Sequence, residues 1–225
     1  MTAITAPIRK SAGQRLVLHG VSWNEYELML KALAESHVFA SYYKGTLELM
    51  SPTYYPHDRS SRLLFFFVAA SAEAFNVPLH SVGTTTFRRK RFKAGLEADE
   101  AFYTYNSKAI REKRFGRKES INLEVDPPPD LAIEVEISRR LGARSKIYAR
   151  LGVPEVWKYN GLRLTFTLLQ QDGTYKVVEK SPTFPKITPD EIAEWVLSGV
   201  SRDDTEWLKD VRVWLNKRVN QIAEK

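Results

Sequence analysis

The chain has 225 residues, of which 43% are hydrophobic, and carries a formal net charge of +7. It has no cysteine, which excludes disulfides and thiolate metal sites, and no apolar run of about 18 residues that would cross a bilayer. The first residues lack the apolar core of a secretory signal, so we expect a cytoplasmic protein that folds as one domain.

The first half of the chain alternates between patterns typical of strands and of helices. Ser22 and Glu25 have capping-box spacing at the start of a helix, and Gly45 lies between two strand-like runs, as in a hairpin. Gly95 and Leu96 have the composition of a turn. The predicted elements are a flexible tail (1–13), a strand (14–19), a helix (22–36), hairpin strands (39–44 and 46–51), a long helix (57–75) and strands at 79–82, 84–88 and 101–105.

The second half begins with a charged segment, 108–119, which we expect to form a loop or a short helix. Three prolines, Pro127 to Pro129, then force an extended chain. Thr188 opens another capping box, with a proline at the first helical position. The predicted elements are a strand (130–137), a helix (143–151), strands at 156–159, 163–170 and 175–180, a helix after Thr188 and a last helix (203–223).

Strands dominate the middle of the chain and helices flank them, which predicts an α/β domain with a mixed sheet. The last helix carries an apolar stripe, which favours packing in the core or a contact between two copies. Its apolar residues are Trp207, Leu208, Val211, Trp214, Leu215, Val219 and Ile222.

The strand over 130–137 alternates strictly between apolar and polar residues. Leu131, Ile133, Val135 and Ile137 share one face, and the other face carries Asp130, Ala132, Glu134 and Glu136. Carboxylates gathered on one face repel one another unless a cation lies among them. The pattern therefore favours either a metal site or a solvated acidic face, and it leaves both open.

Metal-dependent hydrolysis of a phosphodiester requires carboxylates, a cation and a group that activates water. Glu134 and Glu136 are about 7 Å apart along one strand face, a spacing that allows them to flank a metal. Asp99 is placed to bring a third carboxylate from a neighbouring strand. Arg144 or Lys146, just after the strand, is placed to supply a cation, but the two lie about 200° apart on a helix and cannot both face one site.

Two basic clusters account for much of the excess positive charge. Residues 88–93 are RRKRFK and residues 111–118 are REKRFGRK. Such clusters favour polyanions through phosphate contacts, although a solvated basic surface has the same composition. The candidate nucleic-acid-binding residues are Arg88, Arg89, Lys90, Arg91, Arg114 and Lys118.

Several motifs, in one order, resemble the Uma-type putative restriction endonuclease family of the PD-(D/E)xK nuclease superfamily. They are RLVLHGVSWNEYELML, GTLELMSPTYYPHDR, VGTTTFRRKRFKAGLEADEAFY, DPPPDLAIEVEIS, IYARLGVPEVWKY and SPTFPKITPDEIAEWV. The resemblance covers roughly residues 14–200. It implies a restriction-endonuclease-like mixed sheet flanked by helices, with extra hairpins, and leaves 201–225 as a C-terminal packing or dimer helix.

The resemblance assigns roles to individual residues. Asp99 matches the superfamily aspartate, and Glu134 and Glu136 match the acidic strand, so these three are the implied metal ligands. Arg144, four residues before the tyrosine of IYA, matches a basic residue thought to replace the superfamily lysine, and Lys146 lies close by. Glu48 matches a recurrent acid and would be an additional site carboxylate.

Two further residues have open assignments. His57 matches a recurrent histidine after the SP loop, but it also suits a helix start. Asp130 is placed to join the site or to accept hydrogen bonds at a strand entry.

Ala98 replaces the usual proline before Asp99. Arg144 stands in for the superfamily lysine. A neutral lysine is able to act as a base, whereas a guanidinium is not, because it stays protonated.

The resemblance therefore implies a Mg²⁺- or Mn²⁺-dependent endonuclease that cleaves DNA and can act as a homodimer. The lack of a long apolar run predicts no membrane association. The alternative is a nuclease-like module that has lost catalysis and binds nucleic acid or a protein partner.

Overall fold

The computed structural model describes residues 15–33, 36, 38–50, 55–112, 121–137 and 144–223. The predicted tail lies outside these residues. The elements are β1 (Arg15–Leu18), α1 (Trp23–Ala32), β2 (Phe39–Tyr43), β3 (Thr46–Met50), α2 (Tyr55–Ala74), β4 (His80–Ser81), β5 (Thr86–Arg89), the 3₁₀ turn η1 (Lys90–Phe92), β6 (Ala94–Glu97), β7 (Glu100–Tyr103), α3 (Ser107–Glu112), β8 (Leu131–Val135), α4 (Arg144–Leu151), β9 (Glu155–Tyr159), β10 (Leu164–Leu169), β11 (Tyr175–Val178), α5 (Pro189–Gly199) and α6 (Asp204–Ala223).

The strands form two sheets. Sheet A has the order β1-β3-β2-β6-β5 and is antiparallel, and sheet B has the order β11-β10-β9-β8-β7-β4. In sheet B, β8 and β9 are parallel and the other neighbours are antiparallel. The prediction of an α/β fold with a mixed sheet is confirmed, and the antiparallel sheet A stands beside it.

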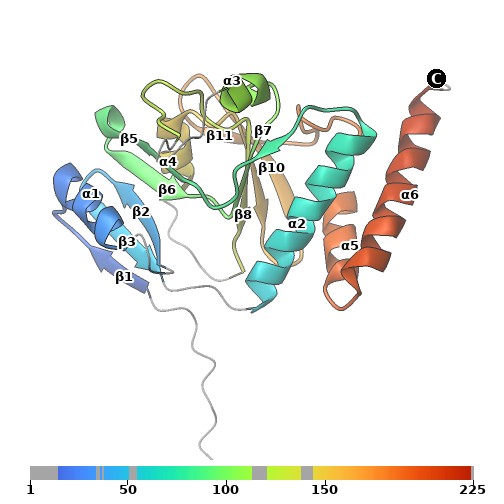
Figure 1. The fold of residues 1–225 in the computed structure, drawn as a ribbon, viewed down its shortest axis with the longest axis horizontal. Helices are drawn as coiled ribbons and strands as arrows, with labels where there is room; N and C mark the ends of the chain where they lie inside the picture. The colour runs from blue at the N-terminus through green and yellow to red at the C-terminus, as the bar shows by residue number, and fades with distance from the viewer. Residues whose placement is uncertain are drawn as a thin grey trace, which may run out of the picture.

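The helices separate and cover the two sheets (Figure 1). α1 covers the outer face of sheet A, where Trp23 and Tyr26 pack on Tyr42 and Leu47. α4 lies between the sheets, because its Ile147 packs with residues from both. α2, α5 and α6 cover the far face of sheet B, in the main core. The result is a layered molecule with one helix enclosed between two sheets.

Local sequence rules explain the helix starts. Ser22 accepts a hydrogen bond from the N–H of Glu25, whose side chain accepts from the N–H of Ser22, as the capping box predicts. Thr188 and Glu191 repeat this arrangement at α5. α6 packs against the main core through Trp207, Val211 and Leu215, and Trp207 is fully buried.

The predicted turn at Gly95 and Leu96 is wrong, because both residues lie in β6 between β2 and β5. The reason is the close approach of helix α1 to this strand. A Cβ atom on Gly95 would lie 2.4 Å from the Tyr26 hydroxyl, so glycine is required here for packing. None of the described helices is long and apolar enough to cross a membrane.

Candidate active site

Asp99 occupies the junction between the two sheets. Only Ala98 and Asp99 separate β6 of sheet A from β7 of sheet B. The Asp99 carboxylate is buried and accepts a hydrogen bond from the backbone N–H of Val135, at an N···O distance of 2.7 Å. This bond holds Asp99 against β8, directly beside Glu134.

Glu134 lies on the face of β8 that was predicted to be acidic. Ile133 and Val135 join the main core on the other face, so the predicted alternation is confirmed. Glu134 is only 1% exposed, and both of its carboxylate oxygens accept hydrogen bonds from Arg144. The hydroxyl of Tyr148 donates to the same carboxylate.

Arg144 connects the two sheets through its guanidinium. Nη1 donates to the Ser41 hydroxyl of β2 at 2.8 Å, and Nη2 donates to the backbone carbonyl of Glu97 at the end of β6, at 2.6 Å. Together with the pair to Glu134, these bonds use donors on all three guanidinium nitrogens. Arg144 is the only lysine or arginine buried in the part of the chain that the structure describes.

Burial and charge act in opposite directions on this cluster. Burial alone would lower the pKa of Arg144, because it disfavours the charged guanidinium. The adjacent Glu134 carboxylate outweighs burial, so the pKa of Arg144 is raised above its usual value. Burial also raises the pKa of the Tyr148 hydroxyl well above its usual range, and the charge of Glu134 adds to this effect. Both groups therefore remain protonated and present donors to Glu134.

Two more carboxylates flank the junction. Burial raises the pKa of Glu97, although Thr86 and Arg144 oppose this effect. Burial also raises the pKa of Glu100. The charge of Arg62 and a hydrogen bond from Ser61 oppose this rise, and the charge of Asp99 adds to it. Burial is therefore the main reason why both carboxyl groups resist ionisation.

A cavity of about 120 Å³ opens beside Asp99. His57 and Arg62, from the first turns of α2, line it together with Thr84 and Phe39. His57 Nε2 lies 3.3 Å from an Asp99 oxygen. Arg62 is exposed and lies 3.4 Å from Glu100, so a cation and an imidazole border the same small space.

Glu136 and Lys146 are more exposed than Glu134 and Arg144. Glu136 follows the end of β8, with its backbone N–H bonded to the Tyr159 carbonyl at 2.6 Å. No group of three histidine, aspartate or glutamate side chains that could hold a metal is found among the described residues. Lys146 points into solvent on α4 while Arg144 is buried, as the helical spacing requires.

Glu48 and Asp130 have structural partners. Glu48 is the cross-strand neighbour of Ser41 and pairs with Arg15, so it borders the cluster through sheet A. Asp130 accepts from the backbone N–H groups of Thr104 and Asn106 at 2.7 and 2.9 Å, which makes it a turn acceptor.

The basic candidates lie elsewhere. Arg88, Arg89, Lys90 and Arg91 belong to the end of β5 and to η1, and none of them lines the cavity at Asp99. Arg89 donates to the Leu123 carbonyl at 2.8 Å, and burial lowers its pKa. Arg114 and Lys118 lie outside the described residues.

Three site contacts were missed from the sequence. Tyr148 follows Arg144 by four residues on α4, a spacing that places both side chains on one helix face and would have revealed it. The contacts of Ser41 with Arg144 and of His57 with Asp99 join distant segments, and the patterns around these residues give no signal for them.

Residues 23–199 match the Uma2 family, described as a putative restriction endonuclease. The chain belongs to the Uma2 family.

One solved structure has a similar fold. The chain is similar to a putative nuclease belonging to DUF820 from Anabaena variabilis ATCC 29413, with a TM-score of 0.52 and 13% sequence identity. The similarity covers 70% of this chain and 91% of that protein. No curated protein matches this Uma2-family chain. The family match supports a nuclease-like function, and the structural match shows the fold.

Proposed function

We propose that the chain is a Mg²⁺-dependent endonuclease that hydrolyses DNA phosphodiester bonds at the cavity beside Asp99. The observation that carries this proposal is the placement of Asp99. Its carboxylate is fixed by the Val135 N–H beside Glu134, and it borders a cavity shared with His57 and Arg62.

The residues at this site suit a divalent cation. Mg²⁺ is usually held by one or two carboxylates, with water and substrate phosphate completing its coordination. Asp99 and Glu134 would hold it, because Asp99 borders the cavity and its hydrogen bond to Val135 keeps it next to Glu134. When bound, the ion would activate water and neutralise charge on the phosphate. Mn²⁺ has similar ligand preferences and would serve in its place.

The protein side chains would position the carboxylate, attract the phosphate and transfer protons. Arg144 and Tyr148 hold the Glu134 carboxylate in one orientation, so they are positioning residues. Arg62, at the rim of the cavity, would attract the phosphate. His57 Nε2, beside Asp99, would accept or return a proton as water attacks, because an imidazole nitrogen acts as either a proton acceptor or a proton donor. Arg144 would not act as the base, since guanidinium stays protonated.

The test is cleavage of supercoiled plasmid DNA in Mg²⁺ or Mn²⁺. Asp99→Asn and Glu134→Gln should each reduce the rate beyond the roughly 10–100-fold loss typical of changes next to the ligands. Glu179→Gln, an exposed carboxylate at the far edge of sheet B, is the matched control. Circular dichroism must show that both variants fold. Folded variants that cleave as fast as the control would refute the site.

The alternative is a module with a nuclease fold that binds nucleic acid or a protein without cutting. One observation favours it: both oxygens of Glu134 already accept hydrogen bonds from Arg144. Calorimetric titration with Mg²⁺ separates the two functions. Heat of binding that is lost in Glu134→Gln supports the nuclease, and absent metal binding with salt-sensitive DNA binding supports the module.

Glu136 remains a candidate third ligand, and Glu136→Gln in the same assays tests it. Additional catalytic roles for Glu48 and Lys146, a cytoplasmic location and homodimers are likewise predictions. Light scattering of the purified protein checks the last of these.

A further inference from the structure

A second and larger cavity lies at the outer end of sheet A. Its volume is about 670 Å³, within the range of about 300–1,000 Å³ typical of ligand sites. Four basic side chains line it: Lys44, Arg91, Lys93 and Arg150. None of the described residues that line it is acidic. The cavity therefore presents a concentrated positive charge in a concave surface, which is suited to an anion.

The start of α1 adds backbone donors to this charge. Ser22, Trp23 and Asn24 all line the cavity. The capping box uses the N–H groups of Ser22 and Glu25, and the structure gives no acceptor to the N–H groups of Trp23 and Asn24 among the described residues. The N-terminus of a ten-residue helix thus faces the same space as the four cations.

Two of the lysines have a backbone conformation that is unusual for their residue type. Lys44 has φ of 45° and Lys93 has φ of 47°, in the left-handed region. Among the described non-glycine residues only Asn76 shares this conformation. The N–H of Lys44 donates to the Lys93 carbonyl at 2.9 Å, which joins the two segments at the rim. Asparagine suits such a backbone better than lysine, so the lysines are placed here at a cost to stability.

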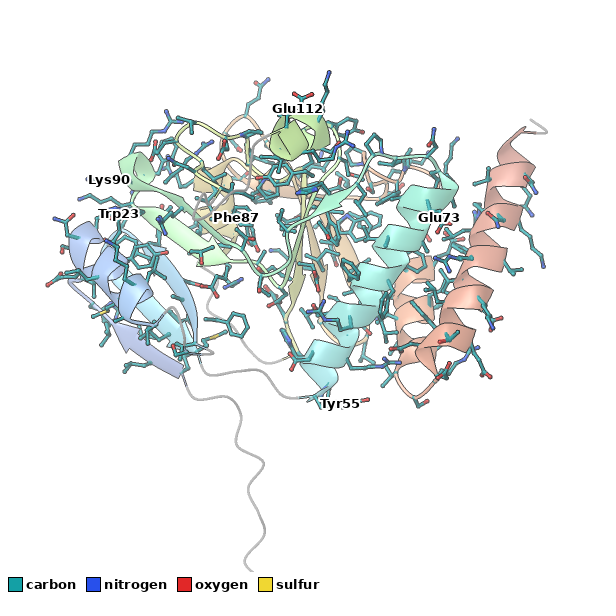
Figure 2. All side chains as sticks on the ribbon, in the orientation of Figure 1. Trp23, Tyr55, Glu73, Phe87, Lys90 and Glu112 are labelled. Carbon is teal, nitrogen blue, oxygen red and sulfur yellow. The ribbon has the colours of Figure 1, made fainter. Side chains whose placement is uncertain are left out.

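The basic cavity is separate from the candidate active site. Phe39, at one end of β2, lines the cavity of Asp99, and Lys44, just beyond the other end, lines the basic cavity. Five residues of extended chain place the two about 16 Å apart. α4 runs the same way, from Arg144 at Glu134 to Arg150 at the basic cavity. Figure 2 shows Trp23 and Lys90 at this outer end, away from Glu73 on α2.

We propose that this cavity binds the phosphate group of a nucleotide or of a nucleic-acid strand, at a site separate from Asp99 and Glu134. The four cations supply charge-assisted hydrogen bonds, and the start of α1 supplies backbone N–H groups. The site does not depend on the proposed nuclease activity, and its binding persists without a divalent metal.

The experiment follows the indole N–H of Trp23 by ¹H–¹⁵N NMR in EDTA. The chain has five tryptophans, and the cross-peak that is absent in Trp23→Phe identifies this one. The probes are inorganic phosphate, adenosine monophosphate and a short single-stranded DNA. We expect the cross-peak to shift and saturate. Tighter binding of the DNA, after allowance for its number of phosphates, assigns the site to a strand, and equal binding assigns it to a free nucleotide.

The decisive variant is Lys44→Asn with Lys93→Asn. Loss of two charge-assisted contacts should weaken binding at least about tenfold, while the melting temperature stays the same or rises. Lys180→Asn with Lys186→Asn removes the same charge from exposed positions outside the cavity and should bind within about twofold of the unchanged protein. A cross-peak that no probe moves, or equal binding by the two double variants, would overturn the proposal.

Discussion

The pair between Arg144 and Glu134 allows a quantitative prediction about stability. Arg144→Met keeps a long unbranched side chain but removes every donor to Glu134, Ser41 and the Glu97 carbonyl. Glu134 is 1% exposed, so its charge would remain buried with Tyr148 as its neutral donor. Removing one partner of a buried ion pair costs about 3–5 kcal/mol.

For a chain of this size, each kcal/mol lowers the melting temperature by about 2–4 °C, so the expected decrease is about 6–20 °C. Urea denaturation at pH 7 measures the same loss as a free energy of unfolding. Adding Glu134→Gln removes the buried carboxylate charge that Arg144→Met leaves without a cation. The double variant should therefore be more stable than Arg144→Met alone. The reasoning is refuted if Arg144→Met costs less than about 1 kcal/mol, or if the two substitutions are additive.

Three further predictions follow from particular contacts. Gly95→Ala should cost about 1–3 kcal/mol in urea denaturation because its methyl group would meet Tyr26, and adding Tyr26→Phe should recover part of that loss; no recovery would contradict the packing argument. Because the pKa of Glu100 is raised above 4.5 in the folded state, its charge destabilises the fold as the pH rises through that raised pKa. Glu100→Gln should therefore match the unchanged protein below about pH 4 and melt at a higher temperature at pH 8, whereas a constant difference would reject this cause. Asp130→Ala should cost about 1–3 kcal/mol, since it leaves buried N–H groups without an acceptor, yet DNA cleavage by the folded variant should be unchanged; a selective loss of cleavage would place Asp130 in the site.

Short-range rules predicted the elements that depend on neighbouring residues. The capping boxes at Ser22 and Thr188 identified two helix starts because each requires only four residues. The alternation around Glu134 gave the correct faces of β8 because the main core accepts one side of that strand. Helical spacing correctly excluded a shared face for Arg144 and Lys146.

The remaining features depend on residues that are distant in the sequence. β6 was missed because Gly95 looks like a turn residue until Tyr26 packs against it. The contact of His57 with Asp99 requires the start of α2 to meet the junction of the sheets, and no local pattern encodes that meeting. The resemblance assigned Asp99 and Glu134 to one site, but it did not show that the carboxylates are held by Val135 and Arg144.

The two-residue crossing from β6 to β7 has a consequence for how the chain tolerates changes in length. Ala98 and Asp99 cannot shift along the chain, because β6 is paired within sheet A and Asp99 accepts a hydrogen bond from Val135 of sheet B. An inserted residue at this crossing would displace the carboxylate or tilt one sheet against the other. The turn at Gly173 between β10 and β11 is exposed at the far edge of sheet B and has room for an insertion. Peptide tags and labels therefore belong at Gly173, and the sheet junction has to keep its length.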